Sequence, residues 1–227
     1  MKKLSLLGIA VAAGVGVSQA QGAVVINEVL GSTTGSDTEF IELYNTGPTD
    51  VDLTGWTIEL WESDFLIPGL VPGTQDGGSP YALDISANGT IIPAGGYALL
   101  ANAEAQTAFN VVADITLQDN AIENSSYTML LKDDLGNIVN SVFVRDSDPD
   151  DQANDGTNII VPDLTVGPDG SFLPAGFTRD TPGGATVSIL EFSPKPAPSA
   201  TPTPGLIPEP ASLALLGLGG LAMLRRR

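Results

Sequence analysis

Aspartates recur at short intervals between residues 146 and 158, and carboxylate oxygens are the ligands that Ca²⁺ prefers in proteins. The segment departs from an EF-hand loop, because Asp151 stands where glycine makes the sharp turn and no glutamate occupies the twelfth position. Two interpretations stay open, a calcium site and a solvated acidic loop. The sequence requires no cofactor. If calcium binds, the candidate ligands are Asp146, Asp148, Asp150 and Asp155.

Two glutamates, Glu28 and Glu42, lie within otherwise apolar stretches. Paired carboxylates carry out acid/base catalysis in glycoside hydrolases, so a carboxylate-based hydrolase is one interpretation. The other is structural, with both side chains at a sheet edge accepting hydrogen bonds from backbone amides. The chain has no histidine and no cysteine, which excludes a Ser-His-Asp triad, a Cys-His nucleophile and a His/Cys zinc site. We therefore predict that the protein is not an enzyme.

Aromatic residues lie in or beside a stretch at about 62–89 that is rich in Gly, Pro, Asp and Ser. This stretch is long for a loop in a compact domain and is interpreted as an insertion. Exposed aromatic rings present an apolar face with a polar tip and can stack on sugars, so the protein could bind exopolysaccharide or other glycans. The alternative is that these rings pack the core or cover its edge. The candidate rings are Trp61, Phe65 and Tyr81.

Short apolar stretches separated by Gly, Pro, Asn and Asp predict an all-β fold, and no window shows a sustained helical period. Trp56, Ile58 and Leu60 alternate with more polar neighbours, so one face of this strand should lie in the core. The turn formers at 132–137 predict a hairpin, and the number of strands predicts a two-sheet sandwich. The clearest strands are 24–30, 39–45, 56–61, 97–101, 127–132, 138–144 and 186–192.

The first 20 residues have the layout of a secretory signal peptide. Lys2 and Lys3 precede an apolar run at 4–17. The small residues Ser18 and Ala20 then mark a cleavage site after Ala20. An amphipathic core helix is the alternative, but the run is apolar on all sides and interrupted by glycine. The Sec translocon and signal peptidase are the expected partners.

The C-terminal end consists of a Pro-Glu-Pro triplet, an apolar run at 211–224 and three arginines. At about 1.5 Å per residue this run gives roughly 21 Å of helix, which is shorter than a hydrocarbon core of about 30 Å. The arginines should hold that end in the cytoplasm, so the body lies outside and the run crosses the inner membrane transiently. A simple tail anchor is the alternative. The residues concerned are Pro208, Glu209, Pro210, Arg225, Arg226 and Arg227.

These terminal residues closely resemble the PEP-CTERM sorting signal, here at 208–227. The resemblance implies an exosortase, a membrane transpeptidase-like enzyme that cuts at the triplet. The protein would then pass from an inner-membrane intermediate to the cell surface or extracellular matrix of a bacterium with an outer envelope. A proline-rich segment at 193–207 precedes the signal and is typical of an extended stalk.

Charge excludes some partners. The chain has 27 acidic and nine basic residues. Five of the basic residues lie in the two terminal segments, so the body at 21–207, which keeps every acid except Glu209, has a net charge of −22. Such a body should repel nucleic acid and anionic membrane surfaces. It has no cysteine, but about 170 residues are enough to bury a core without disulfides.

Three stretches, VINEV at 25–29, EFIELYN at 39–45 and VDLTGW at 51–56, resemble the lamin tail domain. Further matches follow in the same order at 92–100, 130–139 and 181–183. The resemblance covers most of the body at 21–192 and implies an immunoglobulin-like β-sandwich found in nuclear lamins and secreted bacterial proteins. It favours a structural or adhesive surface protein, with a calcium-dependent or glycan-binding adhesion module as the alternative.

Overall fold

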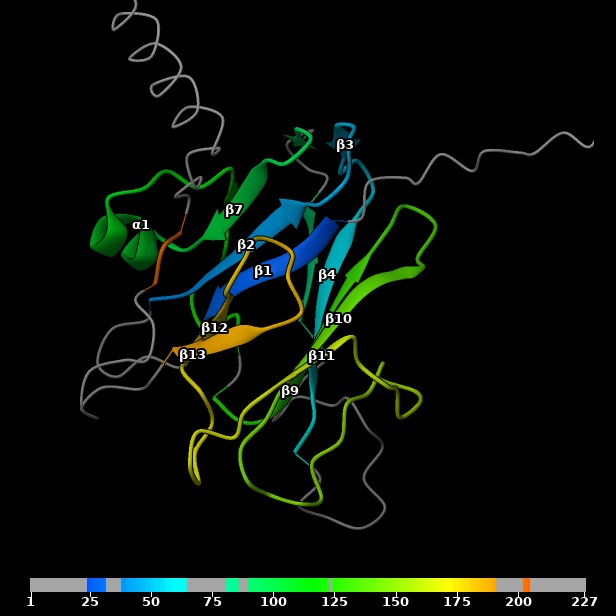
Figure 1. The fold of residues 1–227 in the computed structure, drawn as a ribbon, viewed down its shortest axis with the longest axis vertical. Coiled ribbons are helices and arrows are strands. Elements are labelled where there is room, and N and C mark those ends of the chain that lie inside the picture. Colours follow the sequence, from blue (N-terminus) through cyan, green and yellow to red (C-terminus); the bar gives the residue numbers. More distant parts are fainter. Residues whose placement is uncertain are drawn as a thin grey trace, which may run out of the picture.

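The computed structural model describes residues 24–31, 38–64, 81–85, 90–122, 124–190 and 202–204. In these residues the strands form two main sheets and a separate short pair (Figure 1). The larger sheet has the order β13-β12-β1-β2-β7-β8, with β1 Val24–Leu30, β2 Phe40–Asn45, β7 Tyr97–Ala101, β8 Ile115–Thr116, β12 Gly176–Arg179 and β13 Val187–Leu190.

The second sheet has the order β11-β10-β9-β4-β5. Its strands are β4 Thr57–Glu62, β5 Tyr81–Asp84, β9 Tyr127–Lys132, β10 Ile138–Val144 and β11 Leu164–Val166. The predicted hairpin is confirmed, since β9 and β10 run antiparallel, whereas β11 joins β10 in parallel. The short strands β3 Val51–Asp52 and β6 Ile91–Ile92 pair beside the sandwich.

The core lies between the two sheets, because each central strand buries alternate side chains on its inner face. The inward side chains of β4 include Ile58 and Leu60, both 0% exposed, and Trp56 just before the strand is also buried. Each such Leu or Ile contributes roughly 1.5–3 kcal/mol when fully buried. The other sheet contributes Ile26, Val29, Ile41 and Leu43 to the same cluster.

A short helix, α1 Ala103–Phe109, covers a second apolar cluster at one end of the larger sheet (Figure 1). Asn102 caps its N-terminus by accepting a hydrogen bond of 2.9 Å from the Ala105 N–H. The Phe109 ring meets Phe40 of β2 edge to face, with 5.5 Å between ring centroids. The sequence shows no sign of this helix, because a helix of two turns is too short to show a sustained period.

Most of the predicted strands are confirmed with shifts of about one residue at their ends. The stretch at 62–89 is not entirely loop, because Tyr81–Asp84 forms β5 and pairs with β4 at the edge of its sheet. The signal peptide, the sorting signal and all of the stalk except 202–204 lie outside the described residues. Within the part that is described, no helix has the length and apolar character needed to cross a membrane.

Candidate functional site

Three aspartates from two distant segments form an acidic corner, defined as Asp64, Asp148 and Asp151. Asp64 follows the end of β4, and the other two lie in the loop after β10. One carboxylate oxygen from each lies within 4.8 Å of the others. Asp151 is only 5% exposed, and Asp64 and Asp148 are half-buried. The corner is therefore a tertiary feature of the sandwich.

The loop after β10 is fixed to the end of β4 by hydrogen bonds that backbone carbonyls of residues 62 and 63 accept. Gln152 donates its N–H to the Ser63 carbonyl at 3.2 Å, and Asn154 donates its side-chain amide to the Glu62 carbonyl at 2.8 Å. Within the loop, the carboxylate of Asp146 accepts the Asp148 N–H at 2.6 Å. These contacts hold the carboxylates together by backbone placement, with no need for a ligand to assemble them.

Asp151 is the least exposed member of the corner, and its two carboxylate oxygens differ. Oδ2 accepts a hydrogen bond from the Ser126 hydroxyl, which in turn accepts the Asp146 N–H at 3.0 Å. Oδ1 is buried and has no hydrogen-bond partner among the described residues. Burial raises the pKa of the Asp151 carboxyl to about 6, and the negative charges of Asp146 and Asp64 add to this rise.

The nearest basic residue along the chain, Arg145, is engaged elsewhere. Its guanidinium donates to the backbone carbonyls of Asp146 at 3.0 Å and Asp148 at 2.9 Å. No basic side chain of the described residues forms an ion pair with the carboxylates of Asp148 or Asp151. The acidic corner therefore concentrates negative charge. Because Arg145 contacts backbone carbonyls, it does not neutralise the carboxylates of Asp148 and Asp151.

The four predicted ligands are only partly brought together. Asp148 belongs to the acidic corner, and Asp146 lies close enough to affect the pKa of Asp151. Asp150 is exposed, and its N–H donates a hydrogen bond of 2.9 Å to the carboxylate of Asp148. Asp155 forms a local turn, accepting the N–H groups of Thr157 at 2.9 Å and Asn158 at 2.6 Å. Asp64 was missed because the ligand pattern was sought within one loop, and Asp151 was missed because it was assigned to the turn position of that loop.

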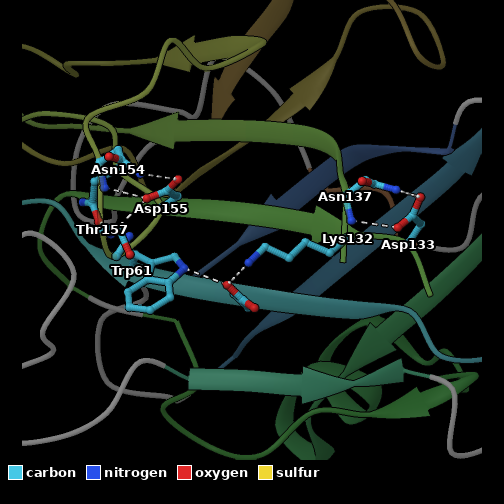
Figure 2. A network of polar contacts seen from close by, with 10 residues as sticks. Trp61, Lys132, Asp133, Asn137, Asn154, Asp155 and Thr157 are labelled. Atoms are coloured by element: carbon cyan, nitrogen blue, oxygen red, sulfur yellow. Dashed lines mark hydrogen bonds and ion pairs between the residues drawn. The ribbon is translucent and has the colours of Figure 1, made fainter. Parts of the chain in front are cut away.

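Trp61 lies between the loop after β10 and an ion pair on the sheet, and Figure 2 shows its hydrogen bond to that pair. Its indole N–H donates to Glu59 at 3.0 Å, and Lys132 forms an ion pair of 2.6 Å with the same carboxylate oxygen. The ring also packs on Gly156, where an added Cβ would lie 2.2 Å from a ring carbon. Trp61 therefore fixes the loop position. Phe65 and the side chain of Tyr81 lie outside the described residues.

Glu28 and Glu42 lie in the two central strands of the larger sheet and are opposite each other in register. The sheet-edge placement was wrong, since β1 pairs on both sides. Both side chains are buried, with 1% and 2% exposed. Glu42 accepts the side-chain amide of Asn27 at 2.9 Å. Their inaccessibility leaves no room for a sugar between the two carboxyls.

A residue of the proline-rich stalk covers Glu28. Thr203 donates its N–H to one carboxylate oxygen at 2.7 Å and its hydroxyl to the other at 2.8 Å. Thr178 of β12 donates a further hydrogen bond of 3.1 Å. Burial raises the pKa of Glu28 above its ordinary value even though these three donors oppose the shift.

This raised pKa predicts a pH effect that Glu28→Gln should remove. An acid whose folded pKa is raised destabilises the fold above that pKa, and the loss is recovered as the pH falls through it. Glu28→Gln should therefore be more stable than the parent at pH 7, with the difference shrinking towards pH 4.5. Urea unfolding of both proteins from pH 7 to pH 4.5 measures this difference, and a constant difference would contradict the assignment.

Two sheets packed face to face around a shared core form an immunoglobulin-like β-sandwich. The Lamin Tail Domain profile matches residues 17–146, which is more than half of the chain, and the chain belongs to the lamin tail domain family. The predicted family and fold class are thereby confirmed. No curated protein matches the chain.

The PEP-CTERM protein-sorting motif matches residues 206–227. This motif marks a protein for export through the inner membrane to the cell surface or extracellular space, with the secretion machinery and an exosortase as partners. The predicted localisation and the sorting signal are confirmed by this match. Cleavage after Ala20 stays a prediction.

Proposed function

We propose that this protein is a non-enzymatic component of the bacterial surface or extracellular matrix, with a structural or adhesive role. The combination of one lamin tail domain with a sorting motif behind a proline-rich segment carries this proposal. The domain is the exported cargo, and the C-terminal signal determines its destination. Cleavage at the triplet releases the domain from its apolar tail.

Three observations support a role without catalysis. The chain lacks histidine and cysteine. Glu28 and Glu42 are buried and hydrogen-bonded to protein groups. Trp61, a candidate for stacking on sugars, packs against Gly156 and has its indole N–H bonded to Glu59. Glycan binding through Trp61, Phe65 and Tyr81 stays a prediction.

The mature C-terminus tests the sorting step. In the producing bacterium, mass spectrometry of the native protein should find an end near Pro208, and the protein should be recovered outside the inner membrane. Glu209→Gln should leave Arg227 in place and retain the protein in the membrane fraction, because the exosortase no longer recognises the triplet. Glu104→Gln changes an exposed glutamate of α1 and serves as the matched control.

Deletion of the gene tests the structural or adhesive role. Loss of the protein should reduce cell aggregation and matrix cohesion, and the parent chain but not Glu209→Gln should restore both. Unchanged aggregation after deletion would contradict the role, and an intact Arg227 in the native protein would contradict cleavage. Turnover of a glycan that Glu28→Gln abolishes without loss of fold would replace the proposal with the hydrolase.

A further inference from the structure

We propose that the acidic corner binds a single Ca²⁺ ion, with Asp64, Asp148 and Asp151 as protein ligands. This site goes beyond the proposed surface role and does not depend on it. It differs from a ligand set within one loop because Asp64 comes from the end of β4. The ion would join this end of β4 to the loop that follows β10.

The spacing of the carboxylate oxygens fits one calcium ion. Calcium binds oxygen at about 2.3–2.6 Å, so two ligands on opposite sides of the ion are about 4.8 Å apart and adjacent ligands are closer. The oxygens of the corner all lie within 4.8 Å of one another. A common centre can therefore be reached with the backbone as it stands.

The unpartnered oxygen of Asp151 points independently to a cation. A buried carboxylate oxygen without a hydrogen bond is costly, and a buried charge is normally paired or bound to a metal. Asp151 is 5% exposed, and its Oδ1 has no partner among the described residues. Arg145, the nearby cation, is used by the carbonyls of Asp146 and Asp148. An ion held between the carboxylates satisfies this oxygen and offsets their repulsion.

The ligand chemistry selects calcium over other ions. All three protein ligands are carboxylates, and the absence of histidine and cysteine from the chain removes the ligands that zinc and copper prefer. Calcium accepts irregular sets of six to eight oxygens and can complete its shell with water, whereas Mg²⁺ demands near-ideal octahedral geometry at about 2.0–2.1 Å. A corner built from three carboxylates of two separate segments is an irregular set of oxygens, which favours calcium.

Thermal unfolding of the full chain in mild detergent tests the site, with the metal salts alone as probes. Addition of 2 mM CaCl₂ should raise Tm by about 5 °C relative to excess EGTA, assuming an affinity of about 0.1 mM. Trp61 provides a second reading, since its ring packs on Gly156 of the loop that carries Asp148 and Asp151. Its fluorescence should change on calcium titration and give the Kd directly.

Matched variants separate the corner from the rest of the acidic loop. Asp64→Asn and Asp151→Asn each remove one ligand charge and should weaken binding at least tenfold. Asp150→Asn makes the same charge change on an exposed neighbour and should keep the parent Kd. Because Asp151→Asn also removes repulsion, its Tm in EGTA should be no lower than the parent value, which shows that the variant folds.

The contrary results are equally specific. No calcium-dependent change in either Tm or fluorescence would overturn the site. The same holds if Asp150→Asn weakens binding as much as Asp151→Asn, because the ion would then be attracted by the loop as a whole. A Tm increase with 2 mM MgCl₂ as large as that with calcium would overturn the choice of ion.

Discussion

Replacing Asn45 with aspartate should lower the free energy of unfolding by about 4 kcal/mol. Asn45 is 0% exposed at the end of β2. Its side-chain amide donates to the carbonyls of Thr49 at 2.7 Å, Ile92 at 3.1 Å and Pro93 at 3.1 Å, and its Oδ1 accepts the Gly47 N–H at 2.9 Å. Aspartate keeps the shape and the Gly47 contact but turns a second oxygen towards three carbonyl oxygens.

Urea unfolding at pH 7 measures the effect of Asn45→Asp. Asn110→Asp is the matched control, since Asn110 is exposed in a left-handed conformation that aspartate tolerates. Its cost should stay within about 0.5 kcal/mol. The penalty at position 45 should also shrink at acidic pH, where the introduced carboxyl takes up a proton and regains a donor. A loss below about 1 kcal/mol at pH 7 would show that the amide is not needed.

Gly176→Ala should lower the free energy of unfolding by at least about 3 kcal/mol. A Cβ at Gly176 would lie 1.9 Å from the carbonyl oxygen of Val29 and 2.8 Å from its carbon. Both are backbone atoms of β1, the strand that β12 pairs with, so no side chain can move aside. The two strands would have to separate. The neighbouring hydrogen bond of 2.9 Å from the Gly31 N–H to the Ala175 carbonyl would then be lost.

Gly136→Ala is the comparison variant for Gly176→Ala. Gly136 has a φ of 79° in the turn between β9 and β10, and an added Cβ meets nothing within 4 Å. Its cost should come from backbone strain alone, at about 1–2 kcal/mol. Urea unfolding of both variants compares steric clash with strain. Equal losses would mean that β12 can shift away from β1 at little cost.

The sequence predicts the central strands because their alternation is strong and local. In β4, Ile58 and Leu60 are buried while Thr57, Glu59 and Trp61 are half-buried, as the alternation indicates. The strands that escape prediction depend on partners distant in the chain. The parallel strand β11 has two buried side chains, Leu164 and Val166, and forms by pairing with β10. Local patterns cannot supply that partner.

The acidic loop shows the same limit at the level of a site. The aspartate spacing drew attention to residues 146–158, and Asp148 is part of the corner. Asp64 could not be found in this way, because nothing next to it in the sequence suggests that β4 ends against the loop after β10. The position of Asp151 argued against an EF-hand, yet its burial makes it the most informative carboxylate.

The hydrogen bonds from Thr203 to Glu28 shorten the linker that connects the domain to its sorting signal. Judged by composition alone, the spacer begins at residue 193, just after the last predicted strand. With Thr203 bonded to the sandwich, the free length begins there instead. Pro208 comes five positions after Thr203, and an extended chain covers at most about 3.6 Å per residue. An exosortase cutting at the triplet must therefore work within roughly 18 Å of Thr203 on the folded domain.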